Sequence, residues 1–219
     1  SPSDAAPEKP IVEKWEWKCA FVGGYRSLAC GAVSFFRDSS LLAVAMENVI
    51  CLWSIQPIGL PWEVSQEASA MAKLTSIKCE LVTVLTHSSP SRPILSLGFA
   101  NGLTNSGRLI SVCKDSIHVW NVLTGSALWS SAVSVYDAGI SQQSLVLDGQ
   151  SSRFAVTVNL PKVSELSKDR QAVLLFDAES PVPLHVHALP SGSRVLSMTF
   201  VPFGKGLRTS SALVILDSE

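Results

Sequence analysis

The four histidines and five cysteines of this sequence are the side chains best suited to bind a metal ion or to take part in catalysis. His185 and His187 lie two residues apart in a predicted strand, where side chains at this spacing share one face and two imidazoles could reach a metal ion. The sequence offers no cysteine, histidine or carboxylate at a matching spacing as a third ligand. We therefore expect both residues, and His118 near Trp120, to be packing histidines rather than metal ligands.

The cysteines give no sign of a metal or redox centre. There are five, without a CxxC pair, at positions Cys19, Cys30, Cys51, Cys79 and Cys113. An odd number of cysteines, placed mostly in apolar strand patterns, indicates reduced and buried thiols. This usage favours an intracellular compartment.

Motifs for phosphate binding and catalysis are also missing. The step at residues 204–206, Gly-Lys-Gly, lacks the GxxxxGK[ST] spacing of a phosphate loop, and we predict a hairpin loop there. Its cations Lys205 and Arg208 are the best local candidates for a phosphate contact. No GxSxG elbow, HExxH motif, paired-carboxylate signature or Cys–His nucleophile pattern occurs. We expect no enzyme, no cofactor and no small-molecule substrate.

The composition is that of stacked sheets. Of the 219 residues, 47% are apolar and 16% are charged, against about 25% charged in an average globular protein. The net charge of −1 gives no general attraction to nucleic acid, so any RNA contact must be local. No stretch approaches the roughly 18 uninterrupted apolar residues of a membrane helix. Residues 1–12 are polar and proline-rich, which predicts a flexible tail or linker and not a signal peptide.

Three segments of the chain end in the same way. Each is a short β-rich run that closes on an aromatic residue, namely Trp53, Trp120 or Phe176, followed by Ser, Asn or Asp. Each also follows another apolar strand, at residues 41–45, 108–112 and 153–158. This recurrence is typical of the third strand of a propeller blade, a four-stranded unit that must stack on its neighbours to bury its faces. We expect the three aromatic rings to fill the space between adjacent blades.

The spacing of the repeats supports this interpretation. Trp53 and Trp120 are 67 residues apart, or about 45 without an insertion of about 22 residues at 57–78, within the propeller repeat of about 40–45. A charged loop at 161–170 lengthens the next repeat. Along the chain, the sequence predicts one outer strand, then three sets of four strands, and then two further strands. The sequence thus predicts an all-β fold, a β-propeller of about three and a half to four blades in residues 13–219. Such a stack leaves long strand edges exposed, so we expect a larger, tandem propeller protein.

The segment before the first set of strands alternates with a period of two. Trp15, Trp17, Cys19 and Phe21 share one face of residues 13–21. Flanked by lysines, Trp15 and Trp17 could form a basic and aromatic surface for single-stranded RNA or a partner. The same alternation describes the outer strand of a blade packed on one face.

Short matches add a resemblance to a known family. The aromatic-ended strands look like divergent WD repeats, although the Gly-His pairs and the strict Trp-Asp ending of standard repeats are missing. Residues 14–25, 38–45 and 124–129 resemble the second-propeller region of the tandem WD-repeat subunits of the UtpA (t-Utp) subcomplex. That subcomplex belongs to the small-subunit processome, the U3 snoRNA-associated nucleolar particle on pre-ribosomal RNA.

The resemblance implies a scaffold without catalysis. Partners would be other WD-repeat and helical processome subunits and, directly or through them, the 5′ external transcribed spacer of pre-rRNA. The role would be 18S rRNA maturation with a link to polymerase I transcription, in the nucleolus. We expect contacts at the insertion 57–78 and at the charged loop.

Two other function classes stay open at this stage. One is a WD-repeat adaptor of another complex, such as a ubiquitin-ligase substrate receptor or a vesicle-coat subunit, which the identity of the partners would distinguish. The other is a propeller hydrolase, which would need polar or metal-binding residues at the central channel. The strands that begin near Leu41, Leu109 and Phe154 carry mainly apolar residues instead.

Overall fold

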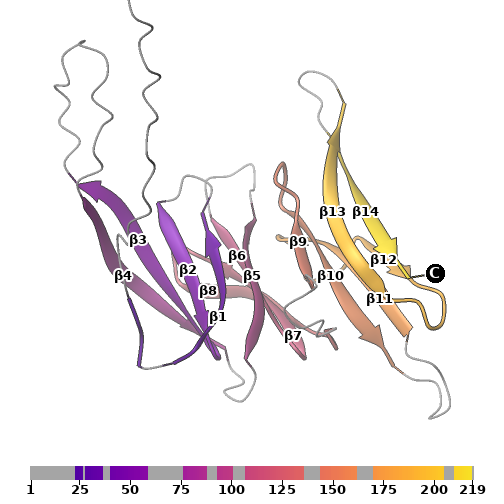
Figure 1. Ribbon diagram of the computed structural model, residues 1–219, viewed down its shortest axis with the longest axis horizontal. Coiled ribbons are helices and arrows are strands. Elements are labelled where there is room, and N and C mark those ends of the chain that lie inside the picture. Colours follow the sequence, from indigo (N-terminus) through magenta and orange to yellow (C-terminus); the bar gives the residue numbers. More distant parts are fainter. Residues whose placement is uncertain are drawn as a thin grey trace, which may run out of the picture.

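The computed structural model describes residues 23–26, 28–36, 40–58, 76–87, 93–100, 107–135, 144–161, 170–204 and 210–218. In these ranges the regular secondary structure is entirely β (Figure 1). None of them holds a helix of the length and apolarity needed to cross a bilayer. The strands are β1 (Cys30–Phe35), β2 (Leu41–Met46), β3 (Val49–Ile58), β4 (Ser76–Thr86), β5 (Ile94–Ala100), β6 (Arg108–Cys113), β7 (Ser116–Asn121), β8 (Ser126–Ala132), β9 (Leu145–Leu147), β10 (Arg153–Leu160), β11 (Arg170–Asp177), β12 (His185–Ala188), β13 (Val195–Phe203) and β14 (Ser210–Asp217).

Consecutive strands pair into antiparallel sheets that follow one another along the chain. Sheet A contains β1 to β4, sheet B contains β5 to β8, sheet C contains β9 to β12, and sheet D contains β13 and β14. The first strands of the sheets lie beside one another, with β1 against β5, β5 against β9 and β9 against β13 (Figure 1). Sheets that meet along their first strands are arranged as blades around a propeller axis. The all-β propeller fold predicted from the sequence is confirmed.

The ends of the predicted insertion at 57–78 belong to sheet A. Strand β3 continues to Ile58 and β4 begins at Ser76, with Pro57 opposite Ile77. Strand β2 pairs with β3 only as far as Ser54, so within the described residues Pro57 has a neighbouring strand on one side alone, where a missing N–H is tolerated. Residues 59–75 lie outside the described part, as do 162–169 of the predicted charged loop, whose last residue, Arg170, begins β11.

Asparagine and aspartate side chains shape the turns between strands, as the sequence pattern leads one to expect. The Oδ1 of Asn121 accepts hydrogen bonds from the N–H groups of Leu123 and Thr124 at the turn after β7. Gly125 completes that turn with φ of +68°, a conformation that favours glycine. These local bonds fix the register in which the following strand returns.

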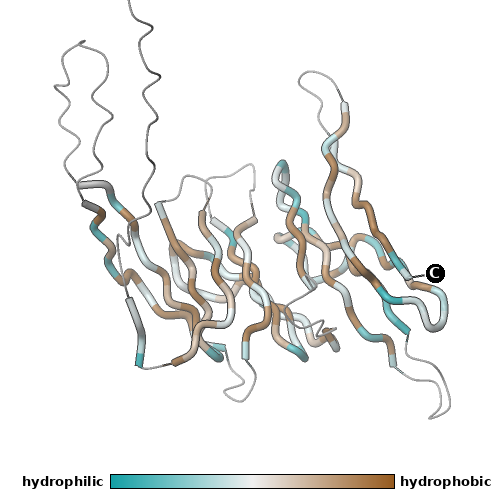
Figure 2. The backbone as a smooth tube through the Cα atoms, in the orientation of Figure 1, coloured by the Kyte–Doolittle hydropathy of each residue, from teal (hydrophilic) through white to brown (hydrophobic). Residues whose placement is uncertain are grey.

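The apolar core lies between the sheets, and the central strands supply both of its faces. In β6, Leu109 belongs to the cluster between sheets A and B, and the next residue, Ile110, belongs to the cluster between B and C. In β10, Phe154 faces sheet B and Ala155 faces sheet D. Figure 2 shows the hydrophobic colour running along such strands through the stack. A sheet that is apolar on both faces is stable only between two neighbours.

We predict that Phe154→Ala lowers the free energy of unfolding by about 3–5 kcal/mol, since the fully buried ring would leave a cavity between sheets B and C. Chemical denaturation monitored by circular dichroism measures this change. Phe203→Ala, at an exposed strand position of sheet D, is the matched control and should change stability by less than about 0.5 kcal/mol. Equal effects at the two positions would contradict the assignment of the core.

Candidate functional site

The three third-strand aromatics occupy one structural position. Each lies opposite an apolar residue of the second strand of its own sheet: Trp53 opposite Leu42, Trp120 opposite Leu109, and Phe176 opposite Phe154. A register shift directly precedes Trp53 and Trp120 in the pairing with the fourth strand. Opposite residues in antiparallel strands point to the same side, so each ring lies on the same face of its sheet as the second-strand residue opposite it; for Trp120 and Phe176 this face is turned toward the preceding sheet.

The space in front of these rings differs from sheet to sheet. Trp120 and Phe176 are buried, the first between sheets A and B and the second between B and C. Phe176 stacks on Phe154 with ring centroids 5.3 Å apart and lies 5.8 Å from Trp129 of sheet B. Trp53 is only half-buried, because its face of sheet A turns away from sheet B and packs with Tyr25 and Leu28. Two of the three rings therefore lie between described sheets.

A buried chain of polar groups surrounds Trp120. The indole Nε1–H donates to Ser111 Oγ at 2.8 Å, and this hydroxyl lies 2.7 Å from Nε2 of His87. The other nitrogen of His87, Nδ1, lies 3.3 Å from Cys113 Sγ. Since the serine oxygen accepts from the indole, its own proton can be donated to Nε2, which leaves the imidazole proton on Nδ1, facing the sulfur. The network joins the end of sheet A to the second and third strands of sheet B.

His118 completes this cluster by packing. Its ring centroid lies 4.0 Å from that of His87, and it stacks on Trp120 at 5.7 Å. Its Nε2 lies 3.3 Å from Ser116 Oγ. The sequence predicts that His118 is a packing histidine, and its contacts fit that role. His87 was not singled out, because it follows β4 in a connection and no local pattern marks it.

Burial keeps the cluster uncharged. Desolvation, with a smaller contribution from nearby His118, lowers the pKa of His87 to about 4, and Asp115 opposes this shift. Desolvation and then Asp115 raise the pKa of Cys113 to about 11, against a hydrogen bond from Ser116. The pKa of His118 is lowered mainly by desolvation too. A nucleophilic cysteine needs the opposite shifts, a stabilised thiolate beside an imidazolium. The arrangement therefore supports structure and not nucleophilic catalysis.

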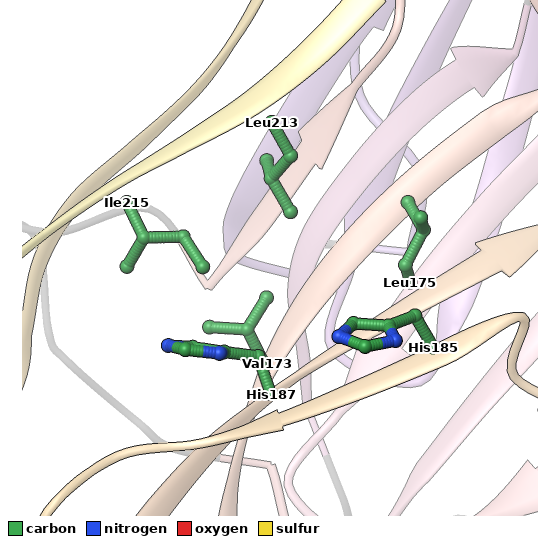
Figure 3. Close-up of a pocket in the computed structure, with 6 residues that line it drawn as sticks. All are labelled: Val173, Leu175, His185, His187, Leu213 and Ile215. Carbon is green, nitrogen blue, oxygen red and sulfur yellow. The ribbon is translucent and has the colours of Figure 1, made fainter.

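His185 and His187 line a cavity of about 320 Å³ between sheets C and D (Figure 3). They lie opposite Leu175 and Val173, and the facing wall is Leu213 and Ile215 of β14. His185 occupies the register position that Trp129 has in sheet B, opposite the residue before the third-strand aromatic. The cavity thus corresponds to the space that Phe176 fills between sheets B and C. Within the described ranges, no group of three or more His, Cys, Asp or Glu side chains could hold a metal ion.

Polar contacts also cross from sheet to sheet at the rim. Arg108 of β6 makes a bidentate ion pair with Glu179, with Nε–Oε1 at 2.9 Å and Nη2–Oε2 at 3.1 Å. Buried Asp148 accepts a hydrogen bond from Ser211 of β14 at 2.9 Å. Burial alone would raise the pKa of Asp148. Hydrogen bonds from Ser151, the Gln150 N–H and Ser211 outweigh this effect, so the pKa of Asp148 is lowered overall. These contacts fix the rotation of one sheet on the next.

Several residues that the sequence singled out fall outside the described part of the chain: Trp15, Trp17, Lys205 and Arg208. Of the described cysteines, Cys51 and Cys113 are buried thiols, as the sequence predicts. Cys30 is exposed and Cys79 half-buried, because their strand positions face solvent at the edges of sheet A. The expectation of buried thiols is therefore wrong for Cys30.

The sequence comparisons point to one group of proteins. Residues 7–80 match the family described as the second beta-propeller of WD repeat-containing protein 75. WD repeat-containing protein 75 of Danio rerio is 30% identical over 119 residues, which covers 54% of this chain and 12% of that protein. The Mus musculus and Xenopus laevis proteins of the same name are 26% and 25% identical over 186 residues, each covering 85% of this chain and 18% of the relative.

The fold is that of a WD-repeat-like β-propeller. The chain is similar to WD repeat-containing protein 75 and spans less than a fifth of the length of these relatives. Among solved structures, Kuenenia stuttgartiensis hydrazine synthase aligns with a TM-score of 0.47 and 8% identity, over 87% of this chain and 51% of that one.

We predict that Ser111→Ala lowers the free energy of unfolding by about 2 kcal/mol. The substitution removes the acceptor of the Trp120 N–H and the partner of His87, and a buried polar group without a partner costs about 1–3 kcal/mol. Urea denaturation measures the loss. Ser130→Ala, at an exposed position of β8, should be within about 0.5 kcal/mol of the parent, and a similar loss there would count against the network.

We also predict that the protein loses stability as the pH falls from about 6.5 to about 4. In this window the unfolded chain binds a proton at His87 that the folded protein does not, because the folded pKa is about 4. One such group changes the free energy of unfolding by at most about 1.4 kcal/mol per pH unit. Urea midpoints measured across the window should fall less steeply for His87→Gln than for the parent. Identical slopes would show that His87 titrates normally.

Proposed function

We propose that this chain is part of a non-enzymatic scaffold of the small-subunit processome, which holds processome proteins on pre-rRNA in the nucleolus. The observation that carries the proposal is the similarity to WD repeat-containing protein 75 over 85% of the chain, in the region where the sequence resembles the second propeller of UtpA subunits. In this role the protein supports 18S rRNA maturation and its link to polymerase I transcription.

The chemistry of the described residues supports a binding role. The buried histidine and cysteine are held neutral, and their hydrogen bonds join two sheets. A stack of rigid sheets presents its turns and outer strands to several partners at once. The net charge of −1 favours protein surfaces over an extended nucleic-acid backbone as the main partner.

The outer edge of sheet C offers one surface for such a partner. Val182, Leu184 and Val186 are each more than half exposed and follow one another along the approach to β12 and the strand itself. Strand β12 is the last strand of its sheet, so its outer edge has no further strand among the described residues. Exposed apolar side chains grouped in this way are typical of protein–protein contacts.

The test uses the full-length protein, tagged at its own locus and purified from cells. We expect WD-repeat and helical processome subunits and pre-rRNA of the 5′ external transcribed spacer to co-purify, and depletion to reduce 18S rRNA on northern blots. The triple variant Val182→Thr/Leu184→Gln/Val186→Thr should reduce the recovered subunits at least threefold without a change in melting temperature.

The matched control is Leu123→Gln, at the exposed turn between β7 and β8, which should leave the recovery unchanged. Recovery of ubiquitin-ligase or vesicle-coat subunits in place of processome subunits would contradict the proposed function and support an adaptor role. Normal recovery with the triple variant would show that this edge is not the contact.

A further inference from the structure

The outer edge of sheet C exposes backbone groups at two residues of β12. The N–H of Leu189 donates to the carbonyl of Gln171, and this bond fixes which residues of β12 bond to β11. In an antiparallel ladder, bonded pairs alternate with pairs whose N–H and C=O groups point away from the neighbouring strand. Val186 and Ala188 belong to the second kind, so these groups point to the outer edge. Among the described residues, no strand lies beyond this edge.

The ladder on the other side of β11 leads to the same assignment. The N–H of Ala178 donates to the carbonyl of the residue opposite it, so Ala172 and Leu174 are the residues of β11 that bond to β10. Ala188 and Val186 lie opposite these two residues. The backbone groups of all four therefore point away from the ladder between β11 and β12.

The edge of β12 lacks the charged side chains that often protect an exposed strand edge. The edge strand of sheet A, β4, carries the exposed ion pair of Lys78 and Glu80. Residues 180–193 contain no Lys, Arg, Asp or Glu. Pro183 and Pro190, which have no N–H, lie on either side of β12. The open edge is thus short and uncharged, with room for a few residues of an extended chain.

The side chains of β12 differ between its two faces. Val186 lies opposite Leu174, on the face of sheet C that turns toward sheet B, and is 51% exposed. His185 and His187 lie on the other face, at the cavity between sheets C and D (Figure 3). A strand that pairs with β12 would place alternate side chains beside these two sets. Apolar residues fit beside Val186, and hydrogen-bond acceptors fit beside the imidazoles.

We propose that β12 binds an extended segment of a partner protein, which adds to the edge of sheet C as a further strand. The segment pairs with the N–H and C=O groups of Val186 and Ala188, and it alternates apolar residues with Asp, Glu, Asn or Gln. Without a cation in residues 180–193, the edge offers no ion pair to a phosphate backbone. This inference rests on the proposed scaffold function and names the element by which a partner is held.

A second copy of this chain fits the same edge less well. Two β12 strands related by a two-fold axis would pair Val186 with Ala188 of the other copy, which sets the two His187 side chains directly opposite each other. Like charges at opposite positions are destabilising whenever both imidazoles are protonated. Neither copy would place Asp, Glu, Asn or Gln beside the histidines, because β12 contains none of them.

The test measures amide hydrogen exchange in the full-length protein, alone and in the complex that its tag recovers from cells. We expect the Val186 and Ala188 amides to exchange at least about tenfold more slowly in the complex, because an added strand accepts hydrogen bonds from them. The matched control is β8, also the last strand of its sheet, where the same alternation turns the N–H groups of Ser130 and Ala132 outward. Exchange of these two amides should not change.

A proline variant tests the same groups by recovery of the partner. Val186→Pro removes an N–H that takes no part in the ladder with β11, so the melting temperature should stay close to that of the parent. The recovered partner should fall at least about tenfold. Ser130→Pro, the equivalent change on β8, should leave the recovery unaltered. If Val186→Pro impairs folding, the exchange measurement on the parent protein decides.

The inference and the proposed function fail in different ways. If Val186 and Ala188 exchange equally fast in both samples, no strand is added, even where processome subunits are recovered and the scaffold function holds. Slow exchange in the isolated protein would overturn the inference too, since the edge would be covered by the chain itself or by a second copy, which light scattering distinguishes. Protection in a complex without processome subunits would contradict the proposed function and support strand addition.

Discussion

The structure depends on the requirement that each sheet be covered on both faces. The central strands of sheets B and C bury apolar side chains on alternate sides, so neither sheet could be stable in isolation. The sheets at the two ends of the described stack meet this requirement on one side only. Their outward faces keep Val33 and Phe35 at one end and Val214 and Leu216 at the other exposed to solvent.

Equivalent positions meet this requirement with different chemistry. Between sheets A and B, the indole of Trp120 donates a hydrogen bond to Ser111, and the hydroxyl of that serine is hydrogen-bonded in turn to His87. Between sheets B and C, Phe176 has no polar atom and stacks on Phe154 and against Trp129. Both arrangements fill the equivalent position between two sheets with uncharged groups, which is the condition that the low-dielectric interior imposes. The residues of one interface between sheets can therefore change without a matching change in the next interface.

Local patterns made much of this architecture predictable. Short β-rich runs that end in an aromatic residue marked the third strands, and Asn121 and Asp177 marked the turns that follow. The hydrogen bond between His87 and Ser111 could not be predicted from the sequence, because Ser111 is 24 residues away and lies in the middle of another sheet. Pro57 suggested a strand end, yet β3 continues through it, since only one side of the strand is paired there. The partial exposure of Trp53 depends on what precedes sheet A, which the residues around Trp53 do not encode.

The order of strands within the sheets has a consequence for local opening. Each sheet is made of strands that follow one another in the chain, so the hydrogen bonds between its strands all lie within one continuous segment. One sheet can therefore separate from the stack while its own hydrogen bonds remain. Amide exchange should then be graded along the chain and slowest in β6, β7, β10 and β11, which have strands on both sides within sheets covered on both faces. Among the described residues, sheet D has two strands and one neighbouring sheet, so the amides of these strands should exchange faster than those in the inner strands of sheets B and C.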